Sequence, residues 1–365
     1  IIQLLPINDT TCNGDWSEMY PYRQVSCFAL NPIYIDLLEI IPNLPEKIKQ
    51  EIKVFAAEQE KLKTIDYPAV FKFKTEKLKQ IYELAKSSLK SDAKYELFKK
   101  NNAEWLNRYS LYCHFRDKYG TSDFHQWPQN SSVDESEIET LSKQLEKELD
   151  YINWIQYICD RQFHDSNHYA TEHRVALKGD LPIGVSIHSV ECWAWPENFR
   201  LNMCAGAPPD PFSDQGQNWG FPTYDWEFME KDDHKLWNLR LNRMGSLFQA
   251  LRVDHILGFF RIWEIPHDTC VSGMLGHFFP CNAATKGELQ SKGLWDIERY
   301  TKPYVRWHLI RDKFGNEAEW AAKTFFNSRN TDPNDDWYDF KEEYDNEVKI
   351  DAAIEKLFKN DTQKA

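Results

Sequence analysis

The sequence predicts an α/β domain with parallel strands, because helical patterns alternate with short apolar strands that end at an aspartate. One such unit spans 174–185, where an apolar strand leads into Asp180. A second unit has a helical pattern over 231–248, followed by a strand that ends at Asp254. In barrel enzymes, the carboxyl end of a strand is the common position of a catalytic carboxylate.

Arg252 and Asp254 are two positions apart, so on a strand their side chains point to the same side of the sheet. A guanidinium beside a carboxylate favours the charged form of that carboxylate. Such a carboxylate suits a nucleophile or an electrostatic stabiliser and does not suit a general acid. The same two residues also fit a structural ion pair, and the pair alone does not separate these alternatives.

The composition excludes two classes of partner. Hydrophobic residues make up 42% and charged residues 28% of the 365 residues, as in an ordinary soluble globular protein. The net charge of −13 and the lack of a basic cluster argue against nucleic acid. No run of about 18 apolar residues occurs, so we expect no membrane-spanning helix.

The eight cysteines are scattered, without a CxxC pair or a zinc-like grouping. This pattern favours reduced thiols and a cytoplasmic protein over a disulfide framework. The chain opens at Ile1 without a methionine and already within an apolar segment. We therefore expect it to be a fragment of a longer protein.

The N-terminal half combines a short strand, an aromatic loop and helices. We expect a buried strand over 1–7, followed by a polar loop that contains Tyr20 and Tyr22. This loop fits either the lip of a binding cleft, with rings that stack on sugar faces, or a plain loop that caps the core. Apolar residues at helical spacing predict helices over much of 33–120 and a long helix from Glu135.

A segment over 189–226 is rich in proline, glycine and aromatic residues, and we expect an ordered functional loop without helix or regular sheet. Its Gln217, Asn218 and Trp219 have the chemistry of a sugar subsite, in which amides bind hydroxyls and an indole packs on a ring face. The 14 tryptophans also fit a large aromatic core, which their usual packing role favours. Beyond His267, we expect loops and charge-rich helices, the last of them around 338–358.

Five segments together resemble the amylomaltase, or 4-α-glucanotransferase, family. Each segment alone is weak evidence, but their order over residues 3–266 is highly specific. The prolines at 208–211 and the long segment after Pro266 look most like the plant cytosolic disproportionating-enzyme branch, which acts in maltose metabolism. The segments are Gln3-Leu4-Leu5-Pro6 with Tyr20-Pro21-Tyr22, Lys178-Gly179-Asp180-Leu181-Pro182-Ile183, Ala205-Gly206-Ala207-Pro208-Pro209-Asp210, Gly216-Gln217-Asn218-Trp219-Gly220, and Arg252-Val253-Asp254-His255-Ile256-Leu257-Gly258-Phe259.

The resemblance implies a (β/α)8 TIM barrel of the α-amylase type with helical insertions, of which only part is present here. We expect 1–266 to form a partial catalytic barrel, with a helical insertion at about 40–130. We expect 267–365 to be a mostly helical insertion that follows the nucleophile strand.

The resemblance also implies retaining transfer of α-1,4-glucan or glucosyl units between maltose, maltooligosaccharides and starch- or glycogen-like glucans. By the family pattern, Asp254 matches the nucleophile and Arg252 the arginine that keeps it ionised. No metal or organic cofactor is expected, because carboxylates and a sugar acceptor suffice for glycosyl transfer. The implied substrate-binding positions are Tyr20, Tyr22, Asp180, Asp210, Gln217, Trp219 and His255.

Retaining transfer needs a second carboxyl group about 5–5.5 Å from the nucleophile, which serves as acid and then as base. In the family this group is a glutamate on the next barrel strand, in a Glu-Asp-Leu-Gly-like motif, and 255–365 contains no such motif. Glu264 follows the nucleophile strand too closely, and Glu317 and Glu319 have a helical, charged context. The resemblance therefore covers the second to fourth strands, and we expect the chain alone to lack transferase activity.

Two other functions stay open. A truncated, non-catalytic homologue would bind glucan through the aromatic loop without turnover, whereas a glucan hydrolase would use water as the acceptor for the same intermediate. Because a barrel fragment leaves sheet edges unpaired, we also expect the isolated chain to be poorly soluble.

Overall fold

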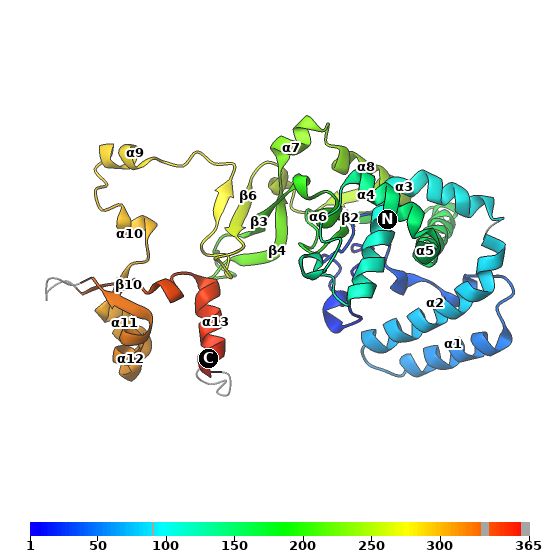
Figure 1. Cartoon of the computed structure of the whole chain (residues 1–365), viewed down its shortest axis with the longest axis horizontal. Helices are drawn as coiled ribbons and strands as arrows, with labels where there is room; N and C mark the ends of the chain where they lie inside the picture. Colours follow the sequence, from blue (N-terminus) through cyan, green and yellow to red (C-terminus); the bar gives the residue numbers. More distant parts are fainter. Residues whose placement is uncertain (90, 330–335, 359–365) are drawn as a thin grey trace. The chain divides into compact units, whose positions relative to one another are not determined.

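A computed structural model describes residues 1–89, 91–329 and 336–358 (Figure 1). Contacts within the chain divide it into two compact units, each of which is described by itself. The first unit comprises 1–201 and 220–259, and the second comprises 202–219 and 260–365.

The domain organisation predicted from the sequence, 1–266 and 267–365, stays a prediction. Parts of its second region, 330–335 and 359–365, lie outside the described residues. No helix among the described residues is both long enough and apolar enough to cross a membrane.

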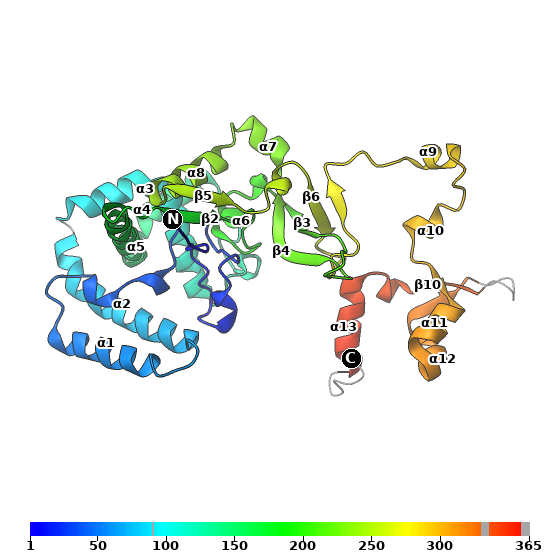
Figure 2. The same ribbon diagram turned by 180° about the vertical axis from the view of Figure 1, so that it is seen from behind.

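The first unit contains a three-stranded parallel sheet with the order β1-β2-β5 (Figure 2). β1 (Ile2–Gln3) pairs with β2 (Leu177–Leu181), and β2 pairs with β5 (Ala250–Val253). Asp180 and Arg252 are partners in the β2–β5 register. Because partners on neighbouring strands point to the same face, these two side chains lie together near the carboxyl end of the sheet.

A helix precedes each of the two inner strands. α5 (Glu146–Glu172) ends shortly before β2, and α8 (Lys235–Leu247) ends shortly before β5. The predicted α/β organisation with parallel strands is therefore confirmed, including the two helix–strand units that end near Asp180 and Asp254.

The helices predicted between the first two strands are also present, although the single long helix predicted from Glu135 is two helices that meet at Leu145. Asp92 begins α3 because its side chain accepts from two backbone N–H groups, and Gly120 ends it with a φ of 71°. A left-handed residue at a helix end costs glycine little, since glycine has no Cβ. These helices are α1 (Glu46–Gln59), α2 (Tyr67–Leu89), α3 (Ala93–Tyr119) and α4 (Glu135–Gln144).

The core of the first unit is largely aromatic. Trp105, Tyr112 and Trp154 on α3 and α5 are each at most 5% exposed. Trp105 stacks on Phe28 at a centroid distance of 6.2 Å, and Tyr112 meets Trp193 edge to face at 5.9 Å. Many of the aromatic residues that also fitted a sugar cleft therefore serve packing.

The prediction of a buried strand over 1–7 was wrong in extent and burial. Only Ile2 and Gln3 form a strand, and Ile1 and Leu5 are 88% and 60% exposed. β1 is an edge strand that pairs with β2 alone. Its apolar residues therefore have a neighbouring strand on one side only.

The prediction that 189–226 lacks helix and regular sheet was also wrong, and the helix within it is α6 (Val190–Ala194). β3 (Phe199–Ala207) and β4 (Gln217–Tyr224) belong to a four-stranded sheet in the order β4-β3-β6-β7. Gly206 lets the strands approach, since an added Cβ would lie 2.1 Å from the carbonyl oxygen of Gln217. β4 is an edge strand, where a proline is tolerated. The other two strands are β6 (Ile262–Pro266) and β7 (His277–Phe279).

The second unit also holds a small antiparallel sheet with the order β8-β10-β9. Its core contains Ile310, Phe325 and Phe326, which are at most 9% exposed. The prediction of a helix around 338–358 is partly wrong. The first part of this segment forms the strand β10, and only the later part forms the helix α13. These elements are β8 (Val305–Arg306), α11 (Trp307–Phe314), α12 (Ala318–Phe325), β9 (Phe326–Ser328), β10 (Trp337–Phe340) and α13 (Glu347–Phe358). Shorter helices are α6 (Val190–Ala194), α7 (Trp226–Lys231), α9 (Lys286–Ser291) and α10 (Glu298–Thr301).

Candidate active site

Arg252 joins two carboxylates at the ends of β2 and β5. Its Nη1 donates to Oδ2 of Asp180 at 2.5 Å, and its Nη2 donates to Oδ1 of Asp254 at 2.8 Å. The predicted placement of Arg252 and Asp254 on the same side is therefore confirmed. Asp254 itself follows β5, and its backbone N–H continues the ladder to the carbonyl of Leu181 at 3.0 Å.

Asp180 is the buried member of this group, with a side chain that is 0% exposed. Its Oδ2 also accepts from the hydroxyl of Tyr22 at 2.7 Å, across 158 residues of sequence. Oδ1 is buried and has no hydrogen-bond partner among the described residues. The partners of Asp180 are thus side chains from two other segments, and the alternative of a turn aspartate bonded to backbone is not what the structure shows.

The charges of this group shift the neighbouring pKa values. The hydrogen bond to Asp180, and then its charge, hold the pKa of Arg252 above its ordinary value. Burial, and then the hydrogen bond to Asp180, raise the pKa of Tyr22. Burial lowers the pKa of His255, although the charge of Asp254 opposes this. At neutral pH the site therefore offers a cation, a phenol and a neutral imidazole beside Asp254.

The tyrosine loop reaches the end of β2. The rings of Tyr20 and Tyr22 lie 5.6 Å apart at an interplanar angle of 44°. Tyr20 is 62% exposed, so it does not cap the core. Tyr22 thus contacts Asp180 at the end of β2, while Tyr20 faces solvent, and the lip of a binding cleft stays a prediction.

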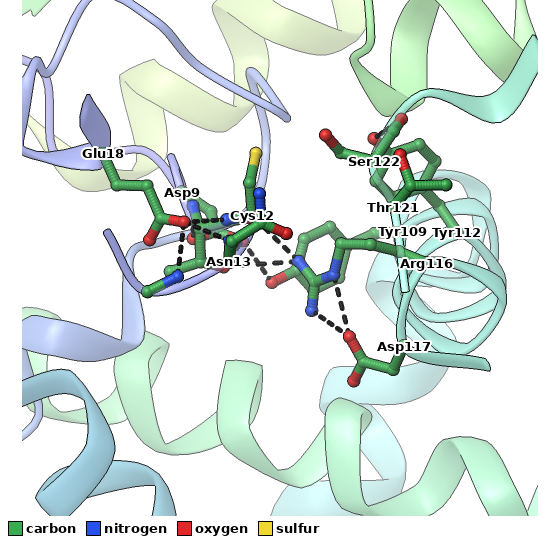
Figure 3. Close-up of polar contacts among 12 residues, drawn as sticks. Asp9, Cys12, Asn13, Glu18, Tyr109, Tyr112, Arg116, Asp117, Thr121 and Ser122 are labelled. Atoms are coloured by element: carbon green, nitrogen blue, oxygen red, sulfur yellow. Dashed lines mark hydrogen bonds and ion pairs between the residues drawn. The ribbon is translucent and has the colours of Figure 1, made fainter. Parts of the chain in front are cut away.

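A buried glutamate that sequence reasoning missed fixes this loop. Oε1 of Glu18 accepts from the N–H groups of Cys12, Asn13 and Gly14, the first and last at 2.7 Å (Figure 3). Its Oε2 accepts from the hydroxyl of Tyr67 at 3.1 Å. Glu18 is only 4% exposed, and Gly14 has a φ of 77°. The Asn13-Gly14 pair was a turn signal, but nothing local showed which acid would bind the turn.

Asp9 and Arg116 tie the base of the same loop to α3 (Figure 3). Asp9 is 0% exposed and accepts from the hydroxyl of Tyr109 at 2.8 Å. Arg116 donates from Nη1 to the carbonyl of Thr11 at 2.8 Å. Burial is the main cause that raises the pKa of Asp9, and Arg116 opposes it. The loop that presents Tyr22 is therefore held by side chains of α2 and α3.

The other three predicted site residues belong to the second unit. Oδ1 of Asp210 accepts from the N–H groups of Phe212 and Ser213, each at 2.8 Å, and so closes a turn. Trp219 donates from Nε1 to Oε1 of Gln217 at 2.9 Å. The structure thus brings Gln217 and Trp219 together on β4, whereas Asp210 lies in the connection between β3 and β4.

Glu264, which the sequence argued against as the acid and base, is buried in the second unit. It lies on β6 with a side chain that is 0% exposed, and its Oε2 is 3.8 Å from Nε2 of His277. Asp180 is also committed to other contacts, because its Oδ2 accepts from both the guanidinium of Arg252 and the hydroxyl of Tyr22.

The family model for glycoside hydrolase family 77, described as 4-alpha-glucanotransferase, matches residues 1–365. The 4-alpha-glucanotransferase DPE2 of Oryza sativa subsp. japonica is 40% identical over 100% of this chain and 38% of its own length. The 4-alpha-glucanotransferase of Chlamydia pneumoniae is 31% identical over 72% of this chain and 49% of its own length. The chain therefore spans half or less of these relatives, and the likeness to the rice protein agrees with the plant branch indicated by the motifs.

Two solved structures share the fold. The amylomaltase from Streptococcus agalactiae in complex with acarbose has a TM-score of 0.59 at 25% identity, over 82% of this chain and 59% of that chain. The amylomaltase from Corynebacterium glutamicum has a TM-score of 0.62 at 22% identity, over 81% of this chain and 40% of that chain. The predicted fold, part of an amylomaltase-type (β/α)8 barrel, is confirmed, and the chain belongs to glycoside hydrolase family 77, the 4-alpha-glucanotransferase family.

Proposed function

We propose that this chain carries the nucleophile half of a 4-α-glucanotransferase active site. The longer enzyme would transfer α-1,4-glucan or glucosyl units from maltose or maltooligosaccharides to a glucan acceptor. The observation that supports this most strongly is the guanidinium of Arg252, which bonds both Asp254 and the buried Asp180 in a chain whose whole length matches the family.

In this proposal Asp254 attacks the anomeric carbon of the donor. Because Oδ1 of Asp254 accepts from Arg252, Oδ2 is the oxygen that forms the bond to the anomeric carbon. The Asp254 side chain is 29% exposed. The glycosidic C–O bond breaks as the Asp254 ester forms, and an acceptor hydroxyl then displaces Asp254 with net retention. The leaving oxygen needs a proton in the first step, and the acceptor must lose one in the second.

Arg252 orients Asp254 through its hydrogen bond, and Asp180 fixes the position of Arg252. Tyr22 is a positioning residue that completes the contacts of Asp180. Tyr20 and His255 are the proposed sugar contacts of the first unit, and Asp210, Gln217 and Trp219 are those proposed for the second unit. No cofactor is invoked, and the scattered free cysteines support a cytoplasmic location.

The first test is turnover by the 365-residue chain alone. Incubation of the purified chain with maltose and glycogen should give no new oligosaccharides, because the carboxyl group that protonates the leaving group is absent. The longer protein should give them, and its Asp254→Asn variant should not. Turnover by the chain alone would refute the assignment of an incomplete site.

A non-catalytic glucan-binding protein is the second candidate, and exposed aromatic rings favour it. Tyr20 is 62% exposed and Phe212 is 96% exposed, which suits sugar stacking whether or not chemistry follows. Titration with maltooligosaccharide, followed by tryptophan fluorescence, measures binding by itself. Binding without turnover in the longer protein as well would select this candidate over the transferase.

A further inference from the structure

We propose that Asp123, His125 and His188 form a binding site for one divalent transition-metal ion, with Zn²⁺ as the best match. The ligand atoms of these three side chains all lie within 4.8 Å of one another. The site lies in the first unit and is independent of the proposed glucan chemistry, for which no metal is expected.

The spacing of the donor atoms fits a tetrahedral ion. Oδ1 of Asp123 lies 3.2 Å from Nδ1 of His125 and 3.4 Å from Nδ1 of His188. Zinc–nitrogen and zinc–oxygen bonds of about 2.0–2.2 Å place two tetrahedral ligands about 3.3–3.5 Å apart. Two of the three separations are therefore already close to the bound geometry, and the third is no greater than 4.8 Å.

The two backbone segments that carry these ligands are joined by one side chain. The hydroxyl of Tyr112 lies 2.9 Å from the carbonyl oxygen of Ser122 and also reaches the carbonyl oxygen of His188. Tyr112 is 0% exposed, and Phe124, between the first two ligands, is 4% exposed. The scaffold is thus buried. It brings His188 to Asp123 and His125, which precede it by more than 60 residues of sequence.

The surroundings of Asp123 orient its carboxylate. Oδ2 accepts from Nε2 of Gln126 at 2.7 Å, and Oδ1 accepts from the backbone N–H of His125 at 3.1 Å. Outer partners of this kind hold metal ligands in place and tune their affinity.

The ligand side chains are partly exposed, although Nδ1 of His188 is itself buried. The exposed fractions are 25% for Asp123, 57% for His125 and 39% for His188. Three protein ligands with solvent access leave a fourth position for water, as in other zinc sites with three protein ligands. The competing explanation is a set of ordinary surface hydrogen bonds between imidazoles and a carboxylate.

The chain offers a matched control for that explanation. Nε2 of His168 lies 3.3 Å from Oε1 of Glu172, so this is an imidazole–carboxylate pair at the surface of α5. Among the described residues, no third ligand group joins it in a metal-like cluster. A simple pair of this kind does not bind a metal ion tightly, whereas three converging ligands do.

The test is calorimetric titration of the untagged, reduced chain, or of a longer protein that contains it, with ZnSO₄ alone. A Cys281→Ser background removes the exposed thiol as a competing ligand. We expect one ion per chain, with His125→Ala and His188→Ala each weakening affinity at least about 100-fold, since even outer partners cost about 10–100-fold. His168→Ala should bind like the parent.

A second readout reports geometry. Co²⁺ bound to two imidazoles, a carboxylate and water should give the intense visible absorption of a tetrahedral ion in the parent and not in His125→Ala. Because His125 is 57% exposed, its removal should leave the circular dichroism spectrum unchanged. The proposal is overturned if the parent binds no Zn²⁺, or if His125→Ala and His188→Ala bind it as the parent does.

Discussion

Arg252 donates to Asp180 at 2.5 Å across 72 residues of sequence, which is shorter than its 2.8 Å contact with Asp254. The cation beside the proposed nucleophile is therefore anchored on a buried carboxylate of the neighbouring strand. This arrangement fixes the guanidinium while only the Asp254 side of the contact remains open to solvent. Asp180 thus fixes the guanidinium that bonds Asp254.

Replacing Arg252 by methionine should lower stability and abolish transfer in the longer enzyme. Asp180 would keep a buried charge without its cation, at a cost of about 1–3 kcal/mol. Urea unfolding of the chain measures this cost. The control is Arg311→Met, because Arg311 is 63% exposed and only 4.0 Å from Asp312. Equal stability of the Arg252 and Arg311 variants would contradict the anchoring role.

Replacing Tyr22 by phenylalanine keeps the ring and removes the hydrogen bond to Asp180. We expect a loss of about 1 kcal/mol in the free energy of unfolding, as for a typical internal hydrogen bond. The matched change is Tyr20→Phe, whose hydroxyl has no hydrogen bond among the described residues. Thermal unfolding should separate the two variants, and an equal effect of both would argue against the Tyr22 contact.

Replacing Glu18 by alanine should loosen the loop that presents Tyr22. Three neighbouring N–H groups lose their acceptor together, and water replaces it only in part. We expect faster amide hydrogen exchange at Cys12 and Gly14 and a loss of about 2 kcal/mol. Glu18→Gln keeps one acceptor oxygen and should restore part of the protection. Unchanged exchange in Glu18→Ala would show that the loop is held elsewhere.

Glu191 gives the chain a pH-dependent stability. Burial raises its pKa to about 7 in the folded state, although Ser26 and the N–H of Cys27 donate to it. A raised carboxyl pKa means that the folded state binds the extra proton. Stability from this group is therefore present at acid pH and is lost as pH rises from about 4.5 through about 7.

Glu191→Gln removes this titration. Relative to the parent, the variant should gain stability between pH 5 and pH 8, by about 2–3 kcal/mol if the whole shift is realised. Urea unfolding of both proteins over this pH range measures the difference in their free energies of unfolding. The contributions of the other titrating groups are common to both proteins and cancel in this difference. A constant difference across the range would contradict the buried, protonated state of Glu191.

The parallel strands and their polar ends could be predicted because local pattern determines them. An apolar strand, a following aspartate and a preceding helix recur at Asp180 and Asp254, and strand periodicity places Arg252 on the same side as Asp254. The partner that holds Arg252 most closely was not predicted as such. Strand order and register decide that contact, and neither is encoded within one segment.

The conformation of single loops and strands also explains what the sequence concealed. Glu18 looked like one acid among many, and only folding brings it to the turn at Asn13. The strands β3 and β4 were missed because glycine and proline usually interrupt sheets. At Gly206 the glycine instead permits a close approach of two strands, and Pro222 lies on a sheet edge.

The most direct test of the central claim is trapping of a covalent intermediate on Asp254. An α-maltosyl fluoride needs no protonated leaving group, so the C–F bond can break as the bond to Asp254 forms, with release of fluoride. Because the chain lacks the group that activates an acceptor, the ester should accumulate. Peptide mass spectrometry should locate a maltosyl adduct on Asp254 in the parent, with no adduct in Asp254→Asn. A chain that binds maltooligosaccharide yet forms no adduct, or forms it on another residue, would contradict the account.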